Sequence, residues 1–175
     1  GIGVDNIDLS AAKDHKVTVV NSPLATTTTV AELTLGMMLC VVREIPRADA
    51  SMKAGKWLKK EFEGAELSGK TLGVIGFGRI GAAVAKRAVA FDMNVLGYDP
   101  MVPADEIAKR GGKPVSMDDL LKEADMITMH LPLTADTKAM LNAAAFAQMK
   151  QGVYIVCAAR GGVIDEAALL EALNS

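Results

Sequence analysis

Short apolar runs alternate with amphipathic segments along most of the chain. From Thr71 onward, the apolar runs are separated by stretches whose apolar residues recur at helical spacing. Strands separated by helices of this length predict an α/β fold built on a doubly wound parallel sheet with helices on both faces. Continuous apolar strands fit such a sheet because both of their faces are buried. The expected strands are 71–77, 94–99, 114–116, 126–130 and 153–158, and the expected helices are 79–91, 103–110, 117–123, 142–148 and 165–173.

The part of the chain before Thr71 has a different pattern. A short helix is predicted over "LSAAKDHK" and a strand over "VTVVN", at 17–21. A long helix follows the polar entry "SPLATTTT", and the connector 56–70 leads from it to the first strand of the sheet. Pro46 is expected to end or kink this helix because proline cannot donate a backbone hydrogen bond. The apolar positions at helical spacing in it are Val30, Leu33, Met37, Cys40 and Val41.

Composition and charge narrow the function classes. The chain has 175 residues, enough for one domain with a sizeable core. Its net charge of −2 and the lack of a basic stripe argue against nucleic-acid binding. The sequence has no apolar run of about 18 residues, so it predicts no membrane-spanning helix. Two distant cysteines offer neither a disulfide framework nor metal-ligand spacing, so we expect no metal and a reducing, cytoplasmic location.

A glycine motif follows the first strand of the sheet. In "TLGVIGFGRIGAAVAKR", Gly76, Gly78 and Gly81 have the G-x-G-x-x-G spacing of Rossmann dinucleotide-binding loops, and an alanine-rich helix begins there. The first glycine permits a tight turn, the second lets the backbone approach a pyrophosphate, and the third lets helix and strand pack closely. The helix N-terminus then offers N–H groups to phosphate. The alternative is a glycine-rich turn without a ligand.

Two charged residues refine the cofactor. Asp99 ends the second strand, where a carboxylate can accept hydrogen bonds from the adenosine ribose and repel a 2′-phosphate. This favours NAD over NADP, and the alternative is a turn aspartate before Pro100. Arg79 begins the helix after the glycine motif, where a cation opposes the helix dipole unless phosphate is present. We interpret Arg79 as a pyrophosphate contact, with a solvated surface arginine as the alternative.

His130 follows the fourth strand, at the sheet edge where ligands bind in this fold. Leu131 and Pro132 come directly after it, and the proline favours an extended backbone. Three interpretations stay open for His130. It is part of the wall of an adenine pocket, a structural histidine, or a general acid or base.

Several longer stretches resemble one family, the D-2-hydroxyacid dehydrogenases. They cover nearly the whole chain in the family's order and are "GIGVDNID", "NSPLATTTTVAELTLGMML", "ASMKAGKW", "GAELSGKTLGVIGFGRIG", "GYDP", "ADMITMHLPLT", "FAQMKQGVYIV" and "AARGGVIDEAALLEAL". The resemblance implies NAD-linked hydride transfer on a small 2-hydroxy acid by a homodimer or homotetramer. It assigns Arg160 as the catalytic residue that grips the substrate carboxylate, beside the nicotinamide. A planar guanidinium suits this role because it pairs with a carboxylate through two hydrogen bonds, and an arginine capping a turn is the alternative.

The resemblance also assigns cofactor contacts residue by residue. Ile2 lies in the stretch where relatives contact the nicotinamide, and Ala158 and Ala159 lie beside its carboxamide. Cys157 departs from the family, which usually has Asn there. It is either a buried small residue or a reactive thiol. The remaining assignments are Gly76, Gly78, Arg79, Ile80 and Gly81 at the pyrophosphate, Asp99 and Pro100 at the ribose and adenine, and His130, Leu131 and Pro132 at the adenine.

The same resemblance predicts the domain organisation. Residues 1–23 are expected to end a substrate domain and form a hinge, and 24–175 to form an NAD-binding domain without its last strands. The family's acid/base pair of glutamate and histidine lies beyond the arginine motif, so we expect the chain to bind NAD without turnover. Residues 33–45 and "KWLKKEF" form a dimer contact in the family, the alternative being an ordinary core helix.

The substrate is less defined than the cofactor. "ASMKAGKW" and "FAQMKQGV" resemble members that act on 3-phosphoglycerate, in serine biosynthesis. Members that act on glycerate, glyoxylate or formate are the first alternative. A transcriptional corepressor that senses NAD, built on the same fold, is an alternative from a different functional class.

Overall fold

The computed structural model describes residues 3–4 and 6–175 and contains a five-stranded parallel sheet. Its strand order is β3-β2-β1-β4-β5, and every neighbouring pair is parallel. This order reverses between β1 and β4, as in a doubly wound sheet, so the predicted fold class is confirmed. The strands are β1 (Thr71–Ile75), β2 (Asn94–Tyr98), β3 (Lys113–Pro114), β4 (Met126–Met129) and β5 (Tyr154–Cys157).

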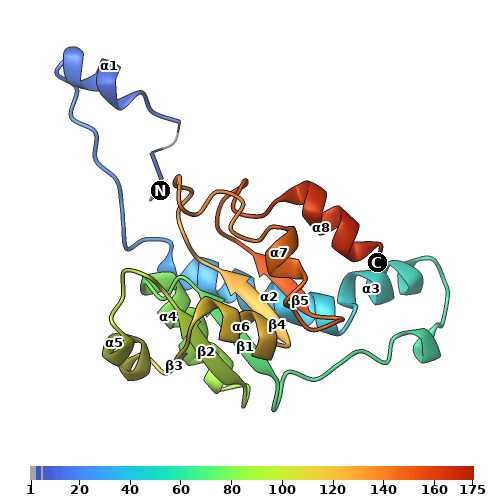
Figure 1. Ribbon diagram of the computed structural model, residues 1–175. Coiled ribbons are helices and arrows are strands. Elements are labelled where there is room, and N and C mark those ends of the chain that lie inside the picture. The colour runs from blue at the N-terminus through green and yellow to red at the C-terminus, as the bar shows by residue number, and fades with distance from the viewer. Residues whose placement is uncertain (1–2, 5) are drawn as a thin grey trace.

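Helices cover both faces of the sheet (Figure 1). On one face α2 (Thr27–Val42) and α4 (Arg79–Val89) bury a cluster that includes Leu72 and Val74 of β1. On the other face α6 (Met117–Glu123) and α7 (Ala143–Phe146) bury a cluster that includes Ile75 and Ile127. Two more helices follow β1 along the chain. α5 (Ala104–Lys109) comes after β2, and α8 (Glu166–Leu173) packs on α7.

The predicted long helix is divided where the proline requires it. α2 ends at Val42, and α3 (Ile45–Lys53) begins after Glu44, which has a left-handed backbone with φ 51°. Pro46 lies in the first turn of α3, where its missing N–H costs no helical hydrogen bond. The expected effect of Pro46 is therefore confirmed.

α2 turns a different stripe toward the core from the one that stands out in the sequence. Leu33 and Val41 are 56% and 45% exposed, although both are large apolar residues. The buried stripe includes Thr34, whose hydroxyl donates to the Val30 carbonyl and is satisfied within the helix. The buried residues of α2 are Ala31, Thr34, Leu35, Met38 and Val42.

The strand predicted at 17–21 is wrong. The short helix before it forms as α1 (Leu9–Asp14), but the following residues adopt no regular structure. Val17 and Val20 are 59% and 82% exposed. A strand needs a hydrogen-bonded neighbour, and this segment stands apart from the sheet in Figure 1. The connector 56–70 is largely irregular as expected, with one short 3-10 turn, η1 (Lys59–Glu61).

Candidate functional site

The carboxyl ends of four parallel strands carry nearly all the predicted site residues. Because the strands run in the same direction, the loops that follow β1, β2, β4 and β5 lie at one edge of the sheet. The structure therefore brings together 76–81, 99–100, 130–132 and 158–160. The predicted contact at Ile2 lies outside the described residues.

The glycine loop has the geometry that its three glycines predict. Gly76 has φ +93°, a conformation that only glycine adopts at low cost. A Cβ on Gly81 would overlap the carbonyl oxygen of Gly76, so α4 approaches β1 as closely as a glycine allows. A Cβ on Gly78 would meet nothing within 4 Å. The space beside Gly78 is therefore open for a ligand.

The N-terminus of α4 faces this open space. The first hydrogen bond of the helix runs from the Ala82 N–H to the Gly78 carbonyl at 3.0 Å. The preceding N–H groups have no partner inside the helix and carry its positive dipole end. Arg79 is exposed there, and Ile80 is half-buried. Amide donors, a cation and a missing Cβ together fit a diphosphate.

Asp99 is held at the end of β2 by two backbone amides. Its Oδ1 accepts from the Met101 N–H at 2.8 Å, and its Oδ2 accepts from the Phe77 N–H at 2.7 Å. Since each carboxylate oxygen has two lone pairs, both can still accept a ribose hydroxyl. The carboxylate is therefore oriented before any ligand arrives.

Phe77 is a site residue that the sequence analysis missed. It lies between the first two glycines of the motif, and its ring is fully buried. A Cβ on Gly97 or Gly112 would lie 2.7 or 2.5 Å from that ring, so these two glycines make room for it. An aromatic residue inside the motif, matched by glycines near the next two strands, is the signal that could have revealed it.

His130 lies against the glycine loop. Its backbone N–H donates to the Ile75 carbonyl at 2.8 Å, and its ring Nε2 lies 3.0 Å from the hydroxyl of buried Thr128. A Cβ on Gly76 would lie 2.8 Å from the His130 carbonyl. Burial lowers the pKa of His130 from 6.5 to about 4. A general acid or base works best with a pKa near the working pH, so this environment favours the pocket-wall and structural interpretations.

The two residues after His130 have different environments. Leu131 is buried, and its side chain packs where a Cβ on Gly76 would stand, at 2.9 Å. Pro132 is exposed, and its carbonyl accepts from the Thr137 hydroxyl at 2.6 Å. The loop after β4 is therefore fixed by its own hydrogen bonds and presents Pro132 to solvent.

Arg160 lines a hollow of about 270 Å³ after β5. Its side chain is exposed, and Nη1 donates to the Ala159 carbonyl at 3.0 Å. Gly162 has φ +83°, which lets the chain turn toward α8. Half-buried Cys157 also packs against the hydrophobic cluster on the α6 face. The hollow is lined by Cys157, Ala158, Ala159, Arg160, Gly161, Gly162, Ile164, Glu166 and Leu169.

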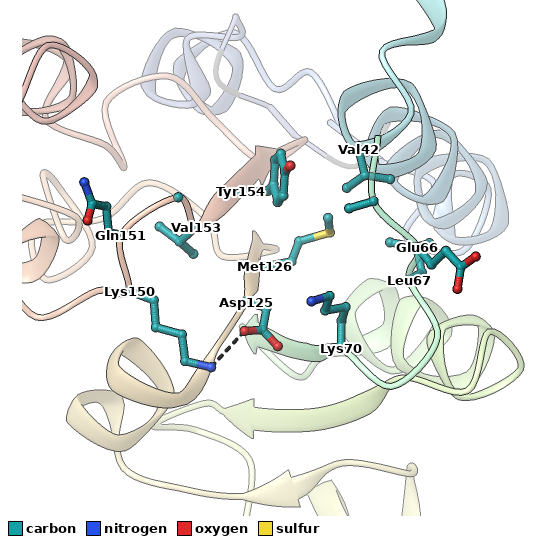
Figure 2. Close-up of a pocket in the computed structure, with 12 residues that line it drawn as sticks. Val42, Glu66, Leu67, Lys70, Asp125, Met126, Lys150, Gln151, Val153 and Tyr154 are labelled. Atoms are coloured by element: carbon teal, nitrogen blue, oxygen red, sulfur yellow. Dashed lines mark hydrogen bonds and ion pairs between the residues drawn. The ribbon is translucent and has the colours of Figure 1, made fainter. Parts of the chain in front are cut away.

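A second cavity, of about 260 Å³, lies at the opposite edge of the sheet (Figure 2). Asp125 there accepts from the Thr71 N–H and from Lys150 Nζ, both at 2.8 Å. These bonds join the beginnings of β1 and β4 to the turn before β5. Both hydrogen bonds lower the pKa of Asp125 below 3.8, that from Lys150 more strongly. Because Asp125 is used in this way, we interpret its role as structural.

Within the described ranges, 3–4 and 6–175, no group of three histidine, cysteine, aspartate or glutamate side chains could hold a metal ion. No helix in this part of the chain is long and apolar enough to cross a membrane.

Comparison with known proteins identifies relatives of the chain. Residues 35–175 match the family model described as D-isomer specific 2-hydroxyacid dehydrogenase, NAD binding domain. D-3-phosphoglycerate dehydrogenase of Methanocaldococcus jannaschii is 52% identical over 99% of this chain and 33% of its own length. Hydroxypyruvate reductase of Thermotoga maritima is 50% identical over the whole chain and 56% of its own length.

A solved structure agrees with these relatives. D-lactate dehydrogenase of Aquifex aeolicus, complexed with NAD and lactic acid, has a TM-score of 0.86 and 39% identity. The match covers 99% of this chain and 52% of that one. The chain thus spans about a third of the length of the phosphoglycerate dehydrogenase and about half that of the other two proteins.

Proposed function

The chain belongs to the D-isomer specific 2-hydroxyacid dehydrogenase family, whose NAD-binding domain it matches, and from this premise we propose that it binds NAD at the carboxyl edge of its sheet. One observation carries the proposal. The open space beside Gly78 faces the N-terminus of α4, and Asp99 stands oriented at the end of the neighbouring strand. Diphosphate and ribose are the two groups that this pair of features recognises.

Each residue of the site has a defined task in this proposal. The N–H groups at the start of α4 bind the pyrophosphate, and Arg79 offsets its charge. Asp99 accepts hydrogen bonds from the adenosine ribose and repels a 2′-phosphate. Neutral His130, with Leu131 and Pro132, forms the adenine side of the pocket. Bound NAD supplies the hydride acceptor for oxidation of a hydroxyl-bearing carbon.

Arg160 is proposed to hold the carboxylate of the substrate. Its guanidinium lies at the same edge as the glycine loop, in the hollow beside Ala158 and Ala159. A bidentate clamp there would orient the reacting carbon, which lowers the entropic part of the barrier. His130 does not complete this clamp as an acid or base, because its Nε2 faces Thr128 and its pKa is about 4. Proton transfer is therefore proposed to need groups from outside residues 24–175. In this assignment 24–175 form the NAD-binding domain, and 1–23 form the end of a substrate domain and the hinge.

3-Phosphoglycerate is the proposed substrate of the whole protein, with serine biosynthesis as its context. The phosphoglycerate dehydrogenase of M. jannaschii, 52% identical, supports this choice. The alternative is a small 2-hydroxy acid without phosphate, which the 50% identical hydroxypyruvate reductase supports. Steady-state rates of the whole protein with 3-phosphoglycerate and with glycerate would separate the two.

We also propose a homodimer or homotetramer. The outward face of α2 bears Leu33, Met37 and Val41, and Trp57 in the connector is 75% exposed. Exposed apolar side chains gathered on one face of a helix support a protein contact at that face. Cys40 and Cys157 are both unpaired, which fits the proposed cytoplasmic location.

Calorimetric titration of the chain with NAD, then with NADP, tests the cofactor assignment. We expect saturable binding of NAD and much weaker binding of NADP. Equal affinity for the two would remove the role given to Asp99. If the chain bound neither NAD nor NADP, the function proposed for the carboxyl edge of the sheet would be wrong.

A further inference from the structure

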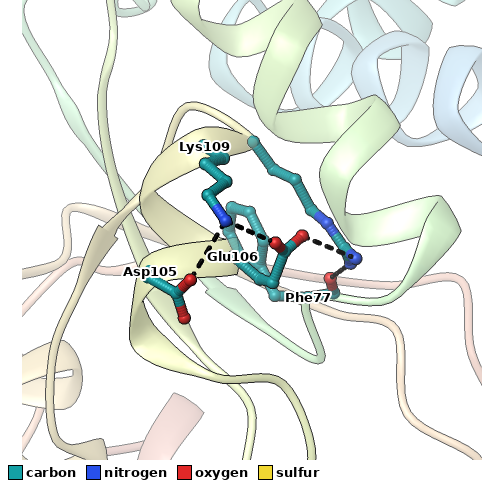
Figure 3. A network of polar contacts seen from close by, with 5 residues as sticks. Phe77, Asp105, Glu106 and Lys109 are labelled. Atoms are coloured by element: carbon teal, nitrogen blue, oxygen red, sulfur yellow. Dashed lines mark hydrogen bonds and ion pairs between the residues drawn. The ribbon is translucent and has the colours of Figure 1, made fainter.

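Arg110, which lies after α5, reaches back to the glycine loop. Its Nη1 donates to the carbonyl oxygen of Phe77 at 2.9 Å (Figure 3). The two residues are 33 positions apart in the sequence. The hydrogen bond therefore links the loop that follows β1 to the segment between β2 and β3, across the fold.

This hydrogen bond determines which way the next amide points. The Phe77 carbonyl and the Gly78 N–H belong to one planar trans peptide, in which they point in opposite directions. No cis peptide occurs in the described chain. Since Arg110 draws the carbonyl toward α5, the Gly78 N–H is turned away from α5. Of the three glycines of the motif, Gly78 is also the one whose added Cβ would meet nothing within 4 Å.

Asp99 orients the preceding peptide in the same manner. It accepts from the Phe77 N–H at 2.7 Å, so the Gly76 carbonyl of that peptide points the other way. That carbonyl occupies the position where a Cβ on Gly81 would stand. Two successive peptides of the loop are thus oriented by two side chains, an acceptor from the end of β2 and a donor from the end of α5.

Arg110 is itself held in place. Its backbone N–H donates to the carbonyls of Glu106 and Ile107, both at 3.1 Å, which ends α5. Its Nη2 lies 3.5 Å from Glu106, a carboxylate that also accepts from Lys109 at 2.8 Å. The Arg110 side chain as a whole is 37% exposed. The backbone of Arg110 is fixed at the end of α5, and Glu106 partners its guanidinium. Together they direct the side chain toward Phe77.

We propose that Arg110 is a positioning residue for the dinucleotide, which orients the Gly78 N–H toward the pyrophosphate through the carbonyl of Phe77. The inference rests on the proposed NAD binding and adds a residue outside the glycine motif to that site. Arg110 acts through the backbone. Replacing the Arg110 side chain therefore weakens the binding of ligands that carry a diphosphate and leaves the binding of ligands without one unchanged.

Lys109 provides a matched control. It is the adjacent cation and pairs with Glu106 as Arg110 does, but its hydrogen bonds go to Asp105 and Glu106 and not to the loop. Arg110→Met and Lys109→Met thus remove the same charge from the same helix end. The Arg110→Lys variant keeps the charge and can restore one donor.

The experiment compares NAD, ADP-ribose and adenosine on the chain and these three variants. Calorimetry serves for the first two ligands and NMR titration for the weaker adenosine. Loss of one ordinary hydrogen bond corresponds to about a threefold to tenfold change in Kd. We expect Arg110→Met to raise the Kd of NAD and ADP-ribose by about this factor and to leave that of adenosine within about twofold. Lys109→Met should change none of them, and Arg110→Lys should recover part of the loss.

The outcomes separate this inference from the function on which it rests. If the unaltered chain fails to bind NAD, the proposed function and the inference both fall. If it binds NAD and Arg110→Met binds equally well, the inference alone is wrong. An equal loss for adenosine and ADP-ribose also contradicts it, because general loosening of the pocket would not spare adenosine. Thermal melting of each variant confirms that binding is measured on folded protein.

Discussion

The carbonyl oxygen of Gly76 occupies the position that a Cβ on Gly81 would need. The beginning of the loop after β1 and the first turn of α4 are therefore in backbone contact, although Gly76 and Gly81 are five residues apart in the sequence. This contact brings the helix N-terminus to the end of β1. Gly78 and Gly81 have different roles, because the space beside Gly78 is open while that beside Gly81 is filled by backbone.

Alanine substitutions at these two glycines are expected to affect different properties, the stability of the fold at Gly81 and NAD binding at Gly78. Gly81→Ala should destabilise the fold by about 2 kcal/mol or more, since forced overpacking costs about 1–3 kcal/mol and the obstacle here is backbone. Gly78→Ala should leave the melting temperature nearly unchanged, because Gly78 has φ −67°, which alanine readily adopts. It should instead weaken NAD binding by filling the ligand's space. Thermal melting and NAD titration of both variants check this, and a Gly78→Ala variant that binds NAD normally would contradict it.

Replacing Asp99 by asparagine should affect both the loop and the ribose. The carboxylate accepts two backbone N–H bonds, and hydrogen bonds to charged groups are worth about 1.5–3 kcal/mol each. We expect Asp99→Asn to weaken NAD binding about tenfold or more and to narrow the gap between NAD and NADP. Paired calorimetric titrations measure both. Asp105→Asn, an exposed carboxylate on α5, is the control, and an unchanged gap would contradict the ribose assignment.

The buried imidazole of His130 should make the fold sensitive to mild acid. Its pKa is about 4 in the fold, against 6.5 for an ordinary histidine, because burial disfavours the charged form. Between these values the unfolded chain binds more protons than the folded chain, so the free energy of unfolding falls as pH drops from 6.5 to about 4. The loss is at most about 3 kcal/mol.

Denaturant titrations across that pH range test this dependence. His130→Gln should flatten the pH dependence, whereas His15→Gln, at an exposed position after α1, should leave it unchanged. Equal pH dependence in the two variants would show that His130 is not the group responsible.

The Asp125–Lys150 pair should contribute stability at a lower pH. The pKa of Asp125 lies below 3.8, first because of the Lys150 hydrogen bond and then because of the Thr71 N–H. Its contribution is therefore complete above pH 3.8 and is lost as pH falls further. Lys150→Met should raise the pKa of Asp125 and cost about 1 kcal/mol or less, since the pair is partly exposed.

Lys70 is the control for this pair, because it influences Asp125 only through longer-range charge. NMR titration of the Asp125 carboxyl in Lys150→Met and Lys70→Met measures the two effects. A larger shift in Lys70→Met would contradict the assignment.

The fold class and most of the candidate site follow from local patterns in the sequence. Continuous apolar runs, helical spacing and the glycine motif each describe neighbouring residues, whose backbone preferences do not depend on the rest of the chain. Parallel topology then places Asp99, His130 and Arg160 at one edge, because each follows a strand.

Other features needed the tertiary structure. Val17 and Val20 belong to a segment with the composition of a strand, yet both remain exposed because no strand of the described chain lies beside them. Leu33 and Val41 have the spacing of a core stripe, yet α2 buries the stripe that contains Leu35 and packs against α4. Apolar spacing defines a face but does not say what covers it.

The sequence by itself determined the sheet, its helices and the loop that would receive a dinucleotide, since each depends on short-range patterns. Only the tertiary structure decided how that loop is held. Asp99 and Arg110 are 22 and 33 residues from Phe77, and no local pattern connects them to its amide and carbonyl. Their contacts exist because the strand order places the ends of β1 and β2 side by side, where a backbone group can find a side-chain partner.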